Sequence, residues 1–419
     1  MFKKIIFGVA AALLMALPTL AQESMSTFTA RLAYAHNDRL YVVNPGGDTP
    51  LVVDETPTYA YSAAWSPDGT KLAYLTSADG EAFSDMKTLK VWDGTQSAAI
   101  VTNFKAPEGM PINWTRDGKL FYFVGNNEFT EEGFLFEMYT VDPVAGAVPE
   151  LVSNQVPFDL GCGGGSPIPM DWAASEETGL GRSRPIAQLT DYGLVYPSFC
   201  AGSRIALFRS FSNELTPFAG GQLQRPALSQ DERSLAGITT AETGETQLVI
   251  VNLETLEEKS TTPSHTLSQL AWGTDGSLYY SSVTESANML TGLTEEQLRT
   301  FSTALGFPTD MPVETKMPHN TVSVYRIAPD GTETAVFEGL DANEIGRMKV
   351  VGSTLYFSVI SNGDEWVRAV VDGTLTMENS FEAADDTIHT NLYAIDLAAP
   401  NGTPILVLED ASQFAAAGQ

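Results

Sequence analysis

A short hairpin phrase recurs along this chain, and it constrains the fold more than any other feature. Its clearest copy is "AAWSPDGTKLAYLTS" at 63–77, which reads as a strand, a tight turn and a second strand. Asp-Gly tolerates the positive φ that a tight hairpin turn requires, and the flanking apolar and aromatic residues are typical of strands. Similar phrases follow in order at 114–122, 228–237 and 272–280, with a worn copy at 351–357. One unit repeated in series predicts a repeat architecture.

A second hairpin phrase accompanies the first. It is written as "LKVWDGTQSAAIV" at 89–101 and as "QLVIVNLETLEEKS" at 247–260. Each is an apolar strand, a turn rich in Asp, Asn, Pro or Gly, and a short outer strand. Two hairpins make a four-stranded unit, which must pack against neighbours because it cannot bury both of its faces alone. Four-stranded units at this spacing predict an all-β fold, a β-propeller.

The "WSPDG" hairpin at 65–69, with Leu72, Ala73 and Tyr74 after it, resembles the WD-like propeller repeat of the TolB type. The other copies are degenerate but recur in order, so the resemblance covers nearly the whole mature chain. It implies a periplasmic interaction platform that accepts a partner segment at the mouth of its central channel. We expect neither the amino-terminal TolB domain of that family nor the peptidase domain of related propellers.

The number of blades follows from the spacing of the phrases. We expect about seven blades, with insertions in the loops of one face. Six blades are the alternative, because the first unit shows no inner strand and the tail "ASQFAAAGQ", which would have to supply it, is a poor strand. The expected blade spans are 27–53, 62–102, 110–152, 185–220, 224–263, 267–337 and 345–408.

The first residues are typical of a secretory signal peptide. Lys3 and Lys4 precede an apolar stretch, and small residues end at Ala21. We therefore expect a signal peptide at 1–21, a single propeller domain at 22–419, and a periplasmic or extracellular location. The alternative is an uncleaved anchor, although the apolar run is short for a membrane span.

The chain is strongly acidic. It has 23 Lys and Arg against 52 Asp and Glu, a formal net charge of −29 over 419 residues. Such a chain will not track a phosphate backbone and is repelled by anionic membrane surfaces. We expect no nucleic-acid partner, no membrane insertion after signal cleavage, and a monomer. The sequence has no D-x-D-x-D-G loop, and we expect no metal and no cofactor.

Cys162 and Cys200 are the only two cysteines. An even number of cysteines in an exported chain predicts one disulfide between them. Two free thiols are the alternative. No C-x-x-C is present, so neither a redox motif nor a zinc knuckle is indicated.

Three stretches interrupt the rhythm of the repeats, at 155–190, 282–320 and 361–390. With strands lettered a to d from the axis outward, the second and third join strands b and c, and the first joins strand d to the next strand a. These connections emerge on one face of a propeller, and we expect the loops at 77–88 and 125–134 there too. Long loops on a rigid scaffold commonly carry binding function, although drift could also explain them.

The 282–320 insertion contains a helix signal. Thr294 is placed to cap a short helix, Gln297 stands at the capping-box position, and Gly306 marks its end. The three insertions together supply the candidate binding residues of the decorated face. These candidates are Trp172, Arg182, Arg184, His319, Trp366 and His389.

Each candidate has two readings. The tryptophans could stack on a sugar or a peptide, or pack locally, and the arginines could recognise a carboxylate or balance nearby acids. His319 and His389, with Asp385 and Asp386, could form a metal or acid–base site, but scattered loop histidines are usually solvated. By contrast, Trp65, Trp114 and Trp272 repeat at one hairpin position and are expected to pack between blades.

The sequence contains no catalytic motif that we recognise. It has no H-E-x-x-H, no G-x-S-x-G, and no Gly-Lys-Ser/Thr after its glycine-rich stretch. We therefore assign no catalytic residue. The first hypothesis is a non-enzymatic propeller that binds a protein, peptide or glycan on its decorated face. The alternatives are a propeller enzyme (a glycosidase, lyase or other hydrolase) with its site at the channel mouth, and a structural component of the cell envelope.

Overall fold

The computed structural model describes most of the chain after residue 29. The described residues are 30–36, 39–45, 49–55, 63–79, 86–106, 112–130, 133–157, 188–199, 203–209, 212, 214–219, 223–241, 244–304, 317–373, 389–399, 402–411 and 414–417. The expected signal peptide at 1–21 lies outside them. No helix in this part of the chain is long and apolar enough to cross a bilayer.

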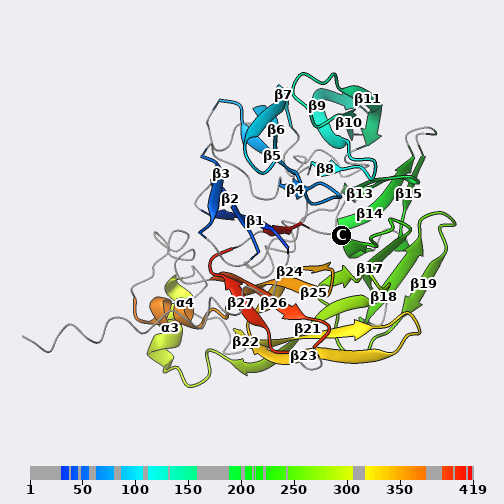
Figure 1. The fold of residues 1–419 in the computed structure, drawn as a ribbon. Helices are drawn as coiled ribbons and strands as arrows, with labels where there is room; N and C mark the ends of the chain where they lie inside the picture. Colours follow the sequence, from blue (N-terminus) through cyan, green and yellow to red (C-terminus); the bar gives the residue numbers. More distant parts are fainter. Residues whose placement is uncertain are drawn as a thin grey trace, which may run out of the picture.

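The described strands form seven four-stranded antiparallel sheets, so the prediction of a seven-bladed propeller is confirmed. Figure 1 shows the sheets arranged as blades around a central axis. The innermost strands are β4 (Ala64–Trp65), β8 (Asn113–Trp114), β12 (Gln188–Thr190), β16 (Gln224–Leu228), β20 (Leu270–Trp272), β24 (Glu344–Val351) and β28 (Phe414–Ala416).

The other three strands of each blade follow in chain order. Blades 1 to 4 contain β1 (Leu32–His36), β2 (Arg39–Val43) and β3 (Leu51–Asp54); β5 (Leu72–Ser77), β6 (Met86–Trp92) and β7 (Ser97–Lys105); β9 (Leu120–Thr130), β10 (Gly133–Val141) and β11 (Glu150–Pro157); β13 (Gly193–Phe199), β14 (Ser203–Arg209) and β15 (Glu214–Pro217). Blades 5 to 7 contain β17 (Ser234–Thr240), β18 (Thr246–Asn252) and β19 (Glu258–Thr261); β21 (Leu278–Asn288), β22 (Pro318–Ile327) and β23 (Glu333–Asp341); β25 (Thr354–Ile360), β26 (Thr390–Asp396) and β27 (Ile405–Leu408).

The ring closes at blade 1, where the sequence interpretation was wrong. The tail is not a poor strand, because β28 pairs antiparallel with β1 and supplies the missing inner strand of blade 1. Phe414 is 1% exposed and packs among residues of blades 1 and 7, such as Tyr34 and Tyr356. Burial of this one aromatic ring compensates for the weak strand propensity of the alanines after it.

The hydrophobic core is divided among the blade interfaces. Seven clusters of buried residues each lie between two neighbouring blades, including one between blade 7 and blade 1. The strands therefore read as runs of apolar residues on both faces, as in the fully buried β25. Each blade depends on both neighbours to cover its faces.

The repeated tryptophans pack between blades, as predicted from the sequence, and they also form hydrogen bonds. Each indole Nε1 donates to a backbone carbonyl on the inner strand of the preceding blade. The three bonds are Trp65 to Ala415 at 3.1 Å, Trp114 to Ala64 at 2.9 Å and Trp272 to Ala227 at 2.9 Å. In blade 4, which lacks such a tryptophan, Gln188 Nε2 donates to the carbonyl of Trp114 at 2.8 Å.

The repeated hairpin turns are tight because an aspartate caps them. Asp68 accepts hydrogen bonds from the Ser66 hydroxyl at 2.5 Å and the Thr70 amide at 3.1 Å, and Gly69 takes a φ of +67°. Asp231 accepts equivalent bonds in blade 5, but Glu232 occupies the glycine position with a φ of +59°. The aspartate therefore fixes the turn even where glycine is absent.

The insertions join the strands that the sequence predicted. The 282–320 and 361–390 segments connect strands b and c of blades 6 and 7, and the 155–190 segment connects blade 3 to blade 4. These connections share one face of the ring, which we call the decorated face; the opposite face, with the a–b turns, is the hairpin face. The expected loop at 125–134 is wrong: apart from 131–132, it belongs to the extended strands β9 and β10.

Closure by β28 predicts a large effect of one residue near the end of the chain. We expect Phe414→Ala to lower the free energy of unfolding by about 3–5 kcal/mol, because it removes a fully buried ring from the closing interface. Urea denaturation followed by circular dichroism measures this loss. Leu151→Ala, which truncates a side chain that is 53% exposed, should change the same quantity by only about 0.5 kcal/mol. Equal losses in both variants would contradict the role of β28.

Candidate functional site

The two described insertions on the decorated face form a pair of helices. α3 (Glu295–Ala304) follows β21, and α4 (Asp364–Val371) follows β25. Figure 1 shows the helices side by side outside the ring. Phe301 of α3 and Val367 and Val370 of α4 are buried in a small hydrophobic cluster separate from the blade interfaces. Two insertions far apart in the sequence thus share one core.

Local sequence explains both helices. The capping box predicted for α3 is present: the Gln297 amide donates to the Thr294 hydroxyl at 3.3 Å, and the Thr294 amide donates to the Gln297 side chain at 2.9 Å. The expected end at Gly306 lies outside the described residues. The sequence interpretation missed α4, although Asp364 in its first turn and apolar residues three and four apart are a helix signal.

A groove lies between the two helices. It has a volume of about 230 Å³ and a lining from both insertions that is half apolar and half polar or charged. Val367 of its lining is buried, whereas Leu293 and Val371 are half-buried. Its lining residues are Met289, Leu293, Gln297, Asp364, Val367, Arg368, Val371 and Asp372.

His319 fastens the helix pair to blade 6. Its Nε2 lies 2.9 Å from Asp341 Oδ1 at the end of β23, and its Nδ1 lies 3.1 Å from Asp364 Oδ2 at the start of α4. Both ring nitrogens therefore face carboxylates of the chain itself. This arrangement joins a blade to a helix and leaves neither nitrogen directed at a ligand.

Asparagines extend this connection toward blade 7. The Asn320 amide donates to Asn362 Oδ1 at 2.9 Å, and Asn362 Nδ2 donates back to the Asn320 carbonyl at 3.0 Å. Asn362 Nδ2 also lies 2.6 Å from Asp341, and Asn320 Nδ2 donates to the carbonyl of Asn343 at 3.2 Å. The groove therefore rests on a hydrogen-bonded base that includes residues of both blades.

The other described candidates have local partners. Trp366 meets Phe301 edge-to-face at 5.9 Å between ring centroids, so it contributes to the helix–helix core. His389 Nδ1 lies 3.1 Å from Asp410 Oδ1, and the His389 amide donates to Ser361. His319 and His389 thus pair with different carboxylates and form no common site through the described residues.

The remaining sequence candidates cannot be placed. Trp172, Arg182 and Arg184 lie outside the described residues, as do Asp385 and Asp386, so their roles stay predictions. The expected Cys162–Cys200 disulfide also lies outside them. Among the residues that the structure describes, no group of three or more His, Cys, Asp and Glu side chains is placed to hold a metal ion.

Sequence reasoning also missed a carboxyl group and an arginine at the channel mouth on the decorated face. Inner strands begin at this face, and Glu344 and Arg225 stand near the starts of β24 and β16. Arg225 has a φ of +47° at a bulge in β16, and its guanidinium donates to the Ser268 hydroxyl at 3.4 Å. Burial raises the pKa of Glu344 to about 7, although the charge of Arg225 opposes the rise.

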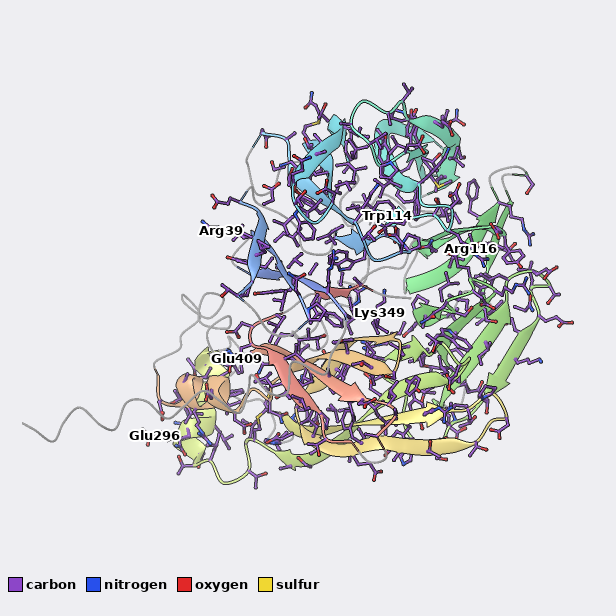
Figure 2. The ribbon with its side chains drawn as sticks, in the orientation of Figure 1. Arg39, Trp114, Arg116, Glu296, Lys349 and Glu409 are labelled. Atoms are coloured by element: carbon purple, nitrogen blue, oxygen red, sulfur yellow. The ribbon has the colours of Figure 1, made fainter. Side chains whose placement is uncertain are left out.

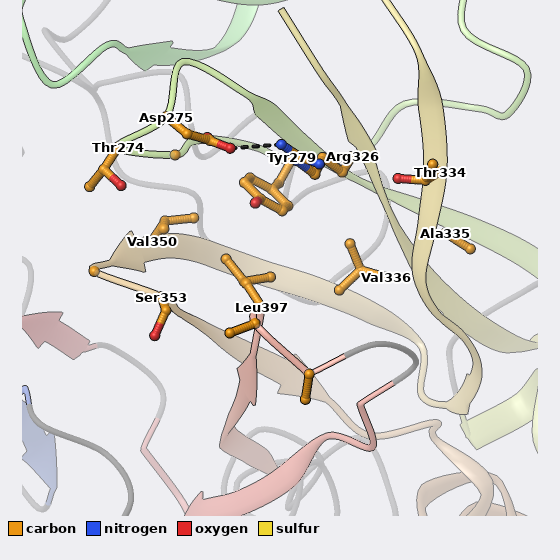
Figure 3. A pocket seen from close by; sticks show the side chains of 14 residues that line it. Thr274, Asp275, Tyr279, Arg326, Thr334, Ala335, Val336, Val350, Ser353 and Leu397 are labelled. Carbon is orange, nitrogen blue, oxygen red and sulfur yellow. Dashed lines mark hydrogen bonds and ion pairs between the residues drawn. The ribbon is translucent and has the colours of Figure 1, made fainter.

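A larger pocket lies on the hairpin face between blades 6 and 7. Its volume is about 490 Å³, and Figure 3 shows its lining side chains. Arg326 donates to Asp275 Oδ2 at 2.7 Å, and its Nε donates to the Ser277 hydroxyl at 2.9 Å. Because Arg326, Asp275 and Ser277 form hydrogen bonds with one another, they are less available to bind a ligand in this pocket.

Comparison with known proteins supports the propeller resemblance. Residues 212–353, about a third of the chain, match the family model of the lipoprotein LpqB beta-propeller domain. The matched segment runs from blade 4 into blade 7, and it confirms the TolB/LpqB-like character of these repeats. No curated protein matches the sequence.

Several solved structures are similar to this chain at low identity. TolB from Acinetobacter baumannii is 16% identical, with a TM-score of 0.40, over 75% of this chain and 65% of its own. An oligogalacturonate lyase in complex with manganese is 12% identical, with a TM-score of 0.46, over 77% of this chain and 79% of its own. A prolyl endopeptidase structure is 11% identical, with a TM-score of 0.48, over 92% of this chain and 51% of its own.

The match thus spans less than two thirds of the TolB chain and about half of the prolyl endopeptidase chain. No functional argument rests on these likenesses.

Glu344 predicts a pH dependence of stability. Its folded pKa of about 7 lies above the ordinary value of 4.5, so the stability associated with its protonated form is complete below pH 4.5 and is lost as the pH rises through 7. We expect Glu344→Gln, which cannot ionise, to gain thermal stability relative to the wild type as the pH rises over this window, by about 2 °C. Thermal unfolding across the window measures the difference. The exposed control Glu254→Gln should show no such trend, and a constant difference for Glu344→Gln would contradict the assignment.

Proposed function

We propose that this protein is an exported binding propeller whose decorated face recognises a peptide segment of a partner protein. The groove between α3 and α4 is the recognition site. The observation that carries the proposal is that two separate insertions build one shared core, with a groove on it that is fastened to blades 6 and 7. Insertions that were only tolerated by neutral sequence drift would need neither the common core nor the contacts of His319.

The chemistry of the groove favours a peptide over a glycan. The apolar part of its lining is aliphatic, from residues such as Leu293, Val367 and Val371, whereas sugar binding commonly uses an exposed aromatic platform. Trp366, the tryptophan of the helix pair, packs edge-to-face against Phe301. A groove of about 230 Å³ accommodates one large apolar side chain of a peptide.

The charges around the groove predict which residues flank the bound apolar side chain in the peptide. Among the described residues that line the groove, Asp364 and Asp372 are acidic and Arg368 alone is a cation, and the whole chain has a net charge of −29. Complementary charge accelerates association and selects among partners. The proposed occupant is therefore an apolar side chain flanked by Lys or Arg.

The location proposed for this interaction is the cell envelope or the medium beyond it. The first residues have the pattern of a signal peptide, and the chain shares repeats with a lipoprotein propeller family. The acidic surface is consistent with a soluble exported protein.

Selection of binders from a library of short random peptides tests this function. We expect the peptides enriched on the wild type to share an apolar residue with Lys or Arg within a few positions. Val371→Asp, which places a charge on the half-buried floor of the groove, should reduce their affinity by about tenfold or more. Fluorescence anisotropy with a labelled selected peptide measures the affinity.

The matched control is Val148→Asp, which makes the same change at a side chain that is 81% exposed in the turn between β10 and β11 on the hairpin face. It should leave the peptide affinity unchanged. All variants must first show the wild-type circular dichroism and thermal midpoint. Peptide affinity equal to that of the wild type in Val371→Asp would exclude the groove as the site. If the wild type binds a glycan and Val371→Asp does not, the ligand of the groove is a sugar rather than a peptide.

A second function, an enzyme at the channel mouth, is favoured by one observation. A carboxyl group with a pKa of about 7 beside an arginine suits general acid–base chemistry at neutral pH. A screen of chromogenic aryl glycosides and esters tests it. Turnover that falls by about a hundredfold or more in Glu344→Gln would support an enzyme, and turnover unaffected by that change would exclude Glu344 as its catalyst.

A further inference from the structure

Among the described residues, two cations of the innermost strand β24 have no acidic partner, and they lie away from the groove proposed above. Arg347 and Lys349 lie two residues apart on β24, so their side chains leave the same side of the strand. Figure 2 places Lys349 on the inner side of the ring. Val351, next in the same alternation, packs in the cluster between blades 7 and 1. This side of β24 therefore faces the seam where the ring closes.

Arg347 is held in place from two directions. Its Nη1 donates to the Phe414 carbonyl at 2.8 Å, and its guanidinium carbon lies 5.7 Å from the centroid of the Phe414 ring. Both contacts come from β28, the closing strand. Because one N–H is used by a neutral carbonyl, the other guanidinium N–H groups keep their capacity to bind an anion.

Lys349 lies close enough to Arg347 for the two positive charges to repel each other. Within the described residues, neither side chain forms an ion pair with a carboxylate, and the ammonium group of Lys349 has no hydrogen-bond partner. Both are half-buried, so part of each side chain stays accessible to solvent. Burial, together with the smaller effect of the Arg347 charge, lowers the pKa of Lys349 to about 8.

This arrangement is costly unless something binds there. Two like charges side by side repel each other, and removing a charge from water without a partner is unfavourable. The chain has more than twice as many acids as bases, so an acidic partner would have been easy to supply. Ala416 of β28 packs in the same seam cluster as Val351, and Arg347 contacts Phe414 on that strand.

We propose that Arg347 and Lys349 form an oxyanion-binding site in the central channel, at the seam between blade 7 and blade 1. The ligand group is a carboxylate or a phosphate, which accepts hydrogen bonds from the guanidinium and the ammonium together. Arg225 stands closer to the decorated mouth on the same channel, beside Glu344. A bound anion also favours the closed ring, because the cations belong to blade 7 and Arg347 is held by the last strand.

Thermal unfolding in the presence of sodium phosphate or sodium succinate tests the site, at ionic strength held constant with sodium chloride. We expect one or both anions to raise the wild-type midpoint by at least about 3 °C. A response to phosphate alone or to succinate alone identifies the ligand group. In Lys349→Met, the midpoint without anion should exceed that of the wild type, because an uncompensated charge is gone, and less than about a third of the anion response should remain.

The matched control is Lys259→Met, which removes one positive charge from the exposed strand β19. It should retain the full anion response of the wild type. If Lys349→Met retains that response, or if the wild type responds to neither anion, the proposal is overturned.

Chemical labelling provides a readout that needs no variant. Acetic anhydride reacts with neutral amines, and mass spectrometry of the digested protein reports each lysine. We expect the anion that raises the midpoint to slow acetylation of Lys349 by about fivefold or more and to leave Lys259 unaffected. Equal labelling of Lys349 with and without that anion would overturn the proposal.

Discussion

The fold depends on contacts between neighbouring inner strands, because each inner strand has one edge without a strand partner. An unpaired edge of this kind leaves carbonyl oxygens that must find other donors. At four of the seven interfaces a side chain of the next blade supplies them, through Trp65, Trp114 and Trp272 and, in blade 4, through Gln188. The same large side chains fill the gap between blades. At three interfaces, one residue type at one position thus contributes to both the spacing and the hydrogen bonding of the blades.

Much of this architecture was predictable from the sequence because the repeated turn is a local signal. Asp-Gly, a large residue before it and apolar residues after it fix each hairpin without reference to the rest of the chain. The closing strand was not predictable in this way. "FAAA" has little strand propensity of its own, and only the seam between Tyr34 and Tyr356 makes it a strand. Tertiary packing determines the conformation of β28, and the local sequence pattern does not predict it.

The candidate sites show the same division. The capping box of α3 lies within four consecutive residues and could be recognised, but the partners of His319 come from positions 341 and 364. The functional meaning of Lys349 depends on what surrounds it in the channel, which no local motif encodes. Sequence reasoning identified the face that carries the insertions. It could not show that two of them share a core, because that core exists only when blades 6 and 7 are adjacent.

The position of β28 has a consequence for how the chain reaches its final state. A protein is made from its amino terminus, so blade 1 remains without its inner strand until the last blade has been synthesised. Until then β1 presents an open edge, and blades 1 and 7 each have an uncovered apolar face. The chain is therefore at greatest risk of pairing with another copy of itself late in synthesis, when six interfaces are formed and the seventh still waits for three residues near the end.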